Sequence, residues 1–296
     1  MKLKEFKAEL KPTISKHNFS SHKNIINKLL LGNMVSQMKN RGFEFEDYRE
    51  YTKNDDATRI DWKATLRANQ LLLRETAEEK AVNVVFLVDV SDTMLFSSGD
   101  KLKCEYAAEI VCALSFVIQR EGNAVGLVLF NDKIQSMIRP RVGQKQYFDI
   151  IKEISTKENY GGKSDLKNAI KNALAILKVP SLLIIISDFI DIGEDWERYL
   201  QMVSLNYNVI GICVRDPLDR GLPKNAGYFV IEDPKSNKRT LIDTSEHYDE
   251  YKEEINHEET YIDRSFKNAK SSYIVVQTNE DFTNPLIQLY NHEFHI

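Results

Sequence analysis

The chain has 296 residues, of which 42% are hydrophobic and 28% charged, a composition typical of a globular protein rather than a disordered one. Its 40 basic and 44 acidic residues are mixed along the sequence and give a net charge of −4, which argues against a nucleic acid as the main partner. No apolar run approaches the ~20 residues of a membrane span, and residues 1–16 lack the apolar core of a signal peptide, so we expect a cytoplasmic protein.

The three cysteines show no pattern of a disulfide framework or a zinc site. No Cys-x-x-Cys pair is present, and the six histidines are scattered along the sequence. We therefore expect reduced thiols, which fit a reducing compartment.

The N-terminal part mixes short helices and strands. Apolar spacing predicts one or two helices within residues 1–40, and alternating aromatic and charged residues predict a half-exposed strand within 42–52. A short helix at 59–65 and a second strand at 71–76 follow. We treat residues 1–80 as an N-terminal segment and residues 81–296 as a separate α/β domain.

From residue 82 onward, apolar strands alternate with amphipathic helices. The alternation predicts a doubly wound, mostly parallel sheet with right-handed crossovers and helices on both faces. The expected strands are 84–88, 124–130, 182–187, 209–214 and 273–278, with hairpin strands at 134–139, 228–231 and 239–243. The expected helices are 101–119, 144–156, 164–177, 195–205, 245–271 and 284–292.

The chain is organised around residues 84–93. Five apolar residues, three of them β-branched, predict a strand buried on both faces, and Asp89, Ser91 and Thr93 follow at alternate positions. A carboxylate and two hydroxyls with this spacing can converge beyond the carboxyl end of a strand, where open α/β sheets bind ligands. Such hard oxygen donors favour Mg²⁺ or Mn²⁺.

A second apolar strand, 182–187, is also followed by a carboxylate, that of Asp188. Between the two strands, Gly161 and Gly162 form a flexible loop that brings the hydroxyl of Ser164 to the start of a helix. One acidic strand end is common, but two of them together with these hydroxyls are far more specific. The predicted metal ligands are Asp89, Ser91, Thr93, Ser164 and Asp188.

The order Asp89-x-Ser91-x-Thr93, Ser164 and Asp188 resembles the metal-ion-dependent adhesion site of von Willebrand factor A domains. The resemblance implies a von Willebrand A-like fold in which hydroxyls of two loops ligate Mg²⁺ directly and the aspartates bind largely through water. An open coordination position then accepts a carboxylate from a partner protein. Thr93 stands where a Ser is usual and Ser164 where a Thr is usual, and both keep the hydroxyl.

A second set of residues lies between about 42 and 89. It consists of Asp47, Tyr48, Arg49, Tyr51, Asp55, Asp56, the run Arg59-Ile60-Asp61-Trp62-Lys63-Ala64, Arg74 and Glu75. This set resembles the signature of domain-of-unknown-function family fifty-eight, whose members carry it just before a von Willebrand A-like strand. That resemblance implies a chaperone-like adaptor working with a MoxR-type AAA+ ATPase or its client. We therefore expect a binding module rather than an enzyme.

Two enzyme classes share parts of these patterns. Haloacid-dehalogenase phosphatases carry Asp-x-Asp-x-Thr after an apolar strand, but Ser91 replaces the second aspartate, which is the general acid, and Asp92 lies one residue too late. Gly162-Lys163-Ser164 ends like a nucleotide-binding loop, but Lys157 stands at the first glycine and no apolar strand precedes it. A phosphohydrolase remains the alternative enzyme.

A purely structural protein is the third alternative. In it, Asp89 and Asp188 cap helices, and Ser91, Thr93 and Ser164 serve as turn or N-cap residues. Two interpretations also stay open for the charged N-terminal residues: a buried ion network or a partner surface. These residues are Arg49, Arg59, Asp61, Arg74 and Glu75. We expect Trp62 in a core.

Overall fold

The computed structural model describes residues 47–52, 60, 62–68, 70–75, 82–177, 181–221, 228–232, 239–243 and 248–286. The helices expected within residues 1–40 lie outside these ranges, as does the boundary expected at residue 80. The last expected helix is seen at 283–286, and its remaining residues lie outside as well. Within these ranges, no helix combines the length and apolar character needed to cross a bilayer.

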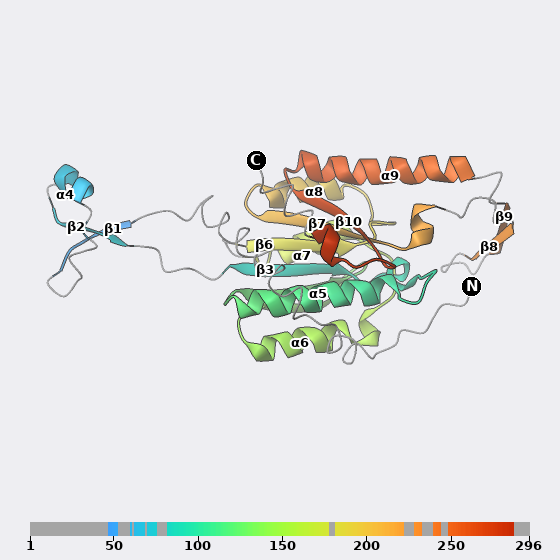
Figure 1. The fold of residues 1–296 in the computed structure, drawn as a ribbon, viewed down its shortest axis with the longest axis horizontal. Helices are drawn as coiled ribbons and strands as arrows, with labels where there is room; N and C mark the ends of the chain where they lie inside the picture. The colour runs from blue at the N-terminus through green and yellow to red at the C-terminus, as the bar shows by residue number, and fades with distance from the viewer. Residues whose placement is uncertain are drawn as a thin grey trace.

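A six-stranded sheet forms the centre of the fold (Figure 1). Its strand order is β10-β7-β6-β3-β4-β5. All neighbouring strands are parallel except β5, which pairs antiparallel with β4 at one edge. The strands are β3 Asn83–Asp89, β4 Ala124–Phe130, β5 Ile134–Arg141, β6 Ser181–Ser187, β7 Asn208–Arg215 and β10 Ser272–Gln277. The predicted doubly wound, mostly parallel α/β sheet is confirmed.

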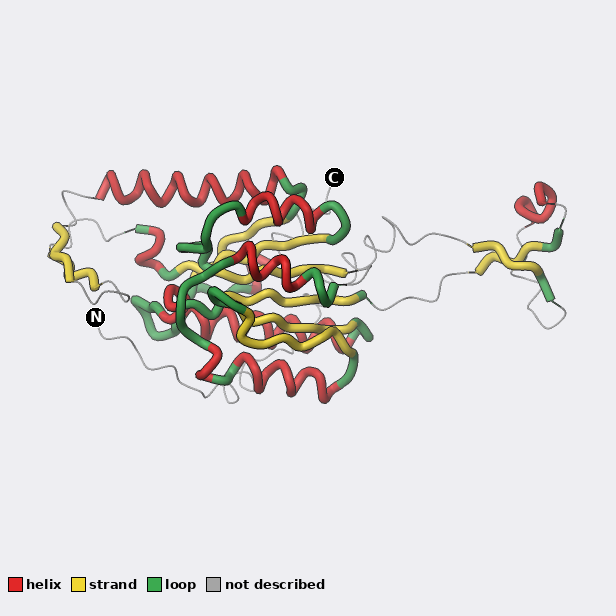
Figure 2. Tube along the Cα trace, turned by 180° about the vertical axis from the view of Figure 1, so that it is seen from behind, coloured by secondary structure: helices red, strands yellow, loops and turns green. Residues whose placement is uncertain are grey.

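Helices cover both faces of this sheet, as Figures 1 and 2 show. Alternate residues of β3 separate the two sides: Val84 and Phe86 pack with helices α5 and α6, whereas Val85 and Leu87 pack with α7, α8 and α9. Burial on both faces explains why the central strands are continuous apolar runs. The helices are α5 Lys103–Arg120, α6 Gln144–Ile154, α7 Leu166–Ala173, α8 Trp196–Ser204 and α9 Tyr248–Asn268.

The strand order reverses between β3 and β6. From β3 the chain continues into β4 on one side, and it returns to place β6 on the other side. Ligands of open α/β sheets bind beyond the carboxyl ends of the two strands at such a point. The fold therefore brings the residues after β3 and β6 to one crevice.

Two small antiparallel pairs complete the described structure. β1 Asp47–Glu50 pairs with β2 Leu72–Glu75, and helix α4 Trp62–Ala68 lies between them in the sequence. β8 Tyr228–Glu232 pairs with β9 Arg239–Asp243. Helix α4 begins later than the predicted 59–65. The expectation that Trp62 lies in a core is wrong, because its side chain is 63% exposed and α4 is only 7 residues long.

The described structure does not test whether the charged N-terminal residues form a buried ion network or a partner surface. Arg59 and Asp61, like Asp55 and Asp56, lie outside the described residues. The side chains of Arg49, Arg74 and Glu75 are likewise not described. Both interpretations stay predictions.

Gly211 in β7 offers a test of the packing. A Cβ atom at this position would overlap the ring of Phe266, which is fully buried and stacks on Tyr273 at 5.2 Å. We expect Gly211→Ala to lower the free energy of unfolding by about 1–3 kcal/mol, because the ring cannot move without disturbing its neighbours.

Urea unfolding measures this effect, and Gly99→Ala is the matched control. A Cβ at Gly99 meets nothing within 4 Å, so its effect is expected to stay within about 0.5 kcal/mol. Equal unfolding midpoints for the two variants would contradict the packing around Phe266.

Candidate functional site

The five predicted site residues lie together beyond the carboxyl ends of β3 and β6. Asp89 is the last residue of β3, and Ser91 and Thr93 follow it into the short 3₁₀ helix η3 Asp92–Leu95. Ser164 precedes α7, and Asp188 follows β6. Both aspartates are fully buried, and the Ser91 and Ser164 side chains are also buried.

The carboxylate of Asp89 links both loops to the strand end. Its Oδ1 accepts from the backbone N–H of Ser91 at 2.9 Å, and its Oδ2 accepts from the Ser164 hydroxyl at 2.8 Å. The Ser187 hydroxyl donates to the same Oδ2, also at 2.8 Å. Ser187 was not among the predicted residues, although its position next to Asp188 was the available signal.

The carboxylate of Asp188 is held in the same way from the other side. Its Oδ1 accepts from the Thr93 hydroxyl at 3.2 Å and from the backbone N–H of Ile190 at 3.0 Å. The Thr93 and Ser91 hydroxyl oxygens are 3.1 Å apart. Because Thr93 and Ser164 give their hydrogens to the aspartates, each hydroxyl keeps oxygen lone pairs for a cation.

A lysine that the sequence analysis missed completes the cluster. The Nζ of Lys103 lies 2.7 Å from Asp188 Oδ2 and 2.9 Å from Asp219 Oδ2, and its side chain is only 1% exposed. Asp219 belongs to η5 Pro217–Arg220, which follows β7. The signal in the sequence was weak: a lysine in the first turn of a helix is unfavourable for the helix dipole, and so calls for another partner.

The charges of this cluster do not balance. The carboxylates of Asp89, Asp188 and Asp219 carry three negative charges when ionised, and Lys103 supplies one positive charge, which leaves two negative charges. Burial, followed by the charge of Asp188, raises the pKa of Asp89 to about 6. Burial alone would lower the pKa of Lys103, but the attraction of Asp188 and Asp219 outweighs it and the pKa is raised.

The donor set fits a hard divalent cation. Hydroxyl and carboxylate oxygens are the donors that Mg²⁺ and Mn²⁺ prefer, and the surplus of two negative charges equals the charge of one such ion. Among the described residues, no group of three or more His, Cys, Asp or Glu side chains is placed to hold a metal. Any metal here would therefore depend on the hydroxyls of Ser91, Thr93 and Ser164.

Helix capping explains only part of the arrangement. Both aspartates do accept a backbone N–H two residues further on, as turn residues do. However, α7 is capped by Asp165, which accepts from the N–H of Asn168, and not by Ser164. The remaining carboxylate oxygens bind hydroxyls and an ammonium from distant parts of the chain.

The family pattern described as "Protein of unknown function DUF58" matches residues 47–261. The chain belongs to this family. A relative, an uncharacterized protein of Mycobacterium tuberculosis (strain ATCC 25618 / H37Rv), is 26% identical over 210 residues, which is 70% of this chain and 66% of that protein. An uncharacterized protein of Mycobacterium bovis gives the same values. The match thus spans just under two thirds of these relatives.

Solved structures similar to this DUF58 chain include the conserved hypothetical protein BatB from Bacteroides thetaiotaomicron. It is 14% identical with a TM-score of 0.48, over 72% of this chain and 98% of that one. A von Willebrand factor type A protein from Catenulispora acidiphila is 11% identical with a TM-score of 0.39, over 75% and 42% of the two chains. Both likenesses concern the fold alone, with TM-scores below 0.5.

Proposed function

We propose that this DUF58 chain binds a protein partner through a divalent cation, Mg²⁺ or Mn²⁺, held beyond the ends of β3 and β6. The observation that carries the proposal is the buried cluster with two surplus negative charges and hydroxyl hydrogens directed at the aspartates. The hydroxyls of Ser91, Thr93 and Ser164 would hold the ion, and Asp89 and Asp188 would orient them.

Such an ion supplies positive charge at an otherwise acidic edge. Neutral hydroxyl ligands leave more of that charge uncompensated than carboxylate ligands do, so an acidic side chain is the favoured partner group. The protein's own residues then have two roles: they hold the hydroxyls in place, and they keep Asp188 engaged with Lys103. We infer an adaptor rather than an enzyme, since Ser91 stands where a phosphohydrolase needs its general acid.

A library of short random peptides tests the proposal. The immobilised chain is expected to retain peptides rich in Asp and Glu in Mg²⁺, and to release them when a chelator is added. Recovery of the same peptides with and without the chelator would contradict a metal-dependent site.

The finer proposal is that the partner is a MoxR-type AAA+ ATPase or its client, with the chain acting as a chaperone-like adaptor. The support for this is the family resemblance. Because an AAA+ ATPase itself uses Mg²⁺ with its nucleotide, a chelator cannot separate the two roles. The variant Thr93→Val can, since it removes one hydroxyl ligand and keeps the side-chain volume.

Thr93→Val is expected to weaken co-sedimentation with a candidate ATPase by at least about tenfold, the size of effect common for groups around a metal. The matched control is Thr156→Val, whose exposed hydroxyl donates to the backbone oxygen of Lys152 in α6 and to none of the site residues. Equal binding of the ATPase by the parent and by Thr93→Val would contradict the proposal that the residues beyond the ends of β3 and β6 bind this partner.

A further inference from the structure

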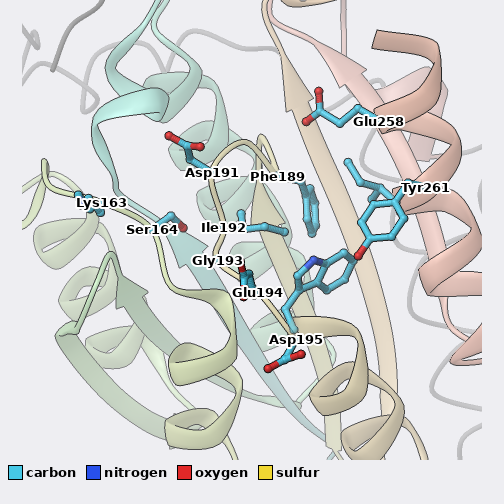
Figure 3. A pocket seen from close by; sticks show the side chains of 12 residues that line it. Lys163, Ser164, Phe189, Asp191, Ile192, Gly193, Glu194, Asp195, Glu258 and Tyr261 are labelled. Carbon is cyan, nitrogen blue, oxygen red and sulfur yellow. The ribbon is translucent and has the colours of Figure 1, made fainter. Parts of the chain in front are cut away.

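The loop that carries Ser164 to the proposed metal site begins with two glycines, and we call residues 161–165 the glycine loop. Gly161 and Gly162 have φ values of 115° and 87°, in the region that favours glycine. Lys163 and Ser164 line a pocket of about 640 Å³, as Figure 3 shows. The pocket leaves this side of the loop open to solvent, so the position of Ser164 depends on hydrogen bonds that the loop makes on its other sides.

The backbone after β3 pairs with the glycine loop. The N–H of Gly161 donates to the carbonyl oxygen of Val90 at 2.7 Å, and the N–H of Asp92 donates to the carbonyl oxygen of Gly162 at 2.9 Å. These two bonds flank Ser91, whose hydroxyl is one of the proposed ligands. The glycine loop therefore lies directly against the segment that holds Ser91.

The side chain of Asp92 adds a third bond to this pairing. Its Oδ1 accepts from the backbone N–H of Gly162 at 3.0 Å. Asp92 therefore bonds Gly162 through both its backbone and its side chain. A Cβ atom added at Gly161 would lie 3.4 Å from the same Oδ1, so the carboxylate lies against both glycines.

Asn131, which follows β4, holds the glycine loop from another side. Its Nδ2 donates to the carbonyl oxygen of Gly161 at 2.6 Å, and its own carbonyl oxygen accepts from the N–H of Asp165 at 2.9 Å. The Asn131 Oδ1 accepts from Nε2 of Gln135 at 2.7 Å, which fixes the orientation of the amide. Because Gly161 precedes Ser164 and Asp165 follows it, these bonds bracket the serine.

We propose that Asp92 is a positioning residue of the metal site: its carboxylate holds the glycine loop so that the Ser164 hydroxyl stays on Asp89. The inference rests on the proposed function, because the position of this hydroxyl matters to an ion only if one binds there. Asp92 acts through the loop and does not itself ligate the ion. A loop that is held before the ion arrives avoids the cost of being ordered by the ion.

Three variants separate the hydrogen-bond acceptor of Asp92 from its charge. Asp92→Ala removes both, whereas Asp92→Asn removes the charge and keeps an oxygen acceptor for the N–H of Gly162. The control is Asp132→Ala, which removes an exposed carboxylate whose Oδ1 would lie 3.8 Å from a Cβ atom at Gly162. The N–H groups of Gly161, Gly162 and Asp165 all donate to other residues, so this control leaves their acceptors in place.

Hydrogen–deuterium exchange of the full chain, followed by mass spectrometry in a buffer with a chelator, measures how firmly the loop is held. We expect residues 161–165 to exchange at least about threefold faster in Asp92→Ala than in the parent, because one hydrogen bond is lost. Asp92→Asn and Asp132→Ala are expected to exchange as the parent does. Unchanged exchange in Asp92→Ala, or equal acceleration by either of the other variants, would overturn this role whether or not an ion binds.

Calorimetric titration of Mn²⁺, with a saturating acidic peptide from the library, measures the consequence for the site. Asp92→Ala and Asp92→Asn lack the same charge, so their difference reports the acceptor alone. We expect Asp92→Ala to bind Mn²⁺ at least about threefold more weakly than Asp92→Asn. If the parent bound no Mn²⁺, the proposed function would fail and this role with it. If the parent bound Mn²⁺ and the two variants bound it equally well, only the role of Asp92 would be overturned.

Discussion

Replacing Lys103 by methionine is expected to lower the free energy of unfolding by about 3–5 kcal/mol, the cost typical of removing one partner from a buried ion pair. The Lys103 ammonium bridges Asp188 and Asp219 at 2.7 and 2.9 Å while being almost wholly shielded from water. Methionine keeps the length of the side chain but leaves both carboxylates without their positive neighbour. The loss therefore comes from uncompensated buried charge rather than from a cavity.

Urea unfolding in a metal-free buffer measures this loss, and Lys101→Met is the control. Lys101 pairs with Glu109 at 2.7 Å, but its side chain is 33% exposed, so its removal is expected to cost no more than about 1 kcal/mol. If Lys103→Met cost as little as Lys101→Met, the buried ammonium would not be holding the two aspartates.

Mg²⁺ is expected to protect the Lys103→Met variant against urea more than it protects the parent. Without the ammonium, Asp89, Asp188 and Asp219 present three negative charges instead of two, and a divalent ion gains more by binding there. Equal protection of the two proteins by Mg²⁺ would show that the charge of Lys103 does not affect the proposed metal site.

The second large effect is expected from Asp89→Asn, which should weaken Mg²⁺-dependent binding of an acidic peptide by at least about tenfold. Asp89 accepts three hydrogen bonds that join Ser91, Ser164 and Ser187. Asparagine keeps the shape and one acceptor, and the hydroxyls can rotate to accept from its amide. Alanine is a poorer test, because Asp89 is fully buried and all three donors would lose their acceptor.

Fluorescence anisotropy of a labelled acidic peptide from the library measures this loss. Asp149→Asn removes the same charge from an exposed position on α6, a helix that supplies none of the five site residues, and should bind as the parent does. Equal weakening by both variants would point to the overall charge of the chain rather than to the site.

The sequence predicted the sheet and the convergence of the five site residues, because both follow from local pattern. Continuous apolar runs mark strands buried on two faces, and the carboxyl ends of neighbouring parallel strands meet at one edge, which joins Asp89 to Asp188. The order of strands along the chain was enough for this inference.

Lys103 and Asp219 were not predicted because their meeting is tertiary. They are 116 residues apart, and only the packing of α5 beside the loop after β7 brings them together. The prediction that Trp62 lies in a core was wrong for a related reason. Its residue type suggests burial, but the burial of a side chain on a short helix depends on what packs against that helix. Trp196 and Tyr261 likewise meet edge to face from two helices whose contact has no signature in the sequence.

The most direct test of the proposed metal site is calorimetric titration of Mg²⁺ and Mn²⁺ into the full chain with a saturating acidic peptide, beside Asp89→Asn under the same conditions. We expect saturable binding of a single ion to the parent, and binding at least about tenfold weaker to the variant. No saturable binding to the parent, or the same affinity in both proteins, would contradict a divalent cation held by Asp89 and its neighbouring hydroxyls.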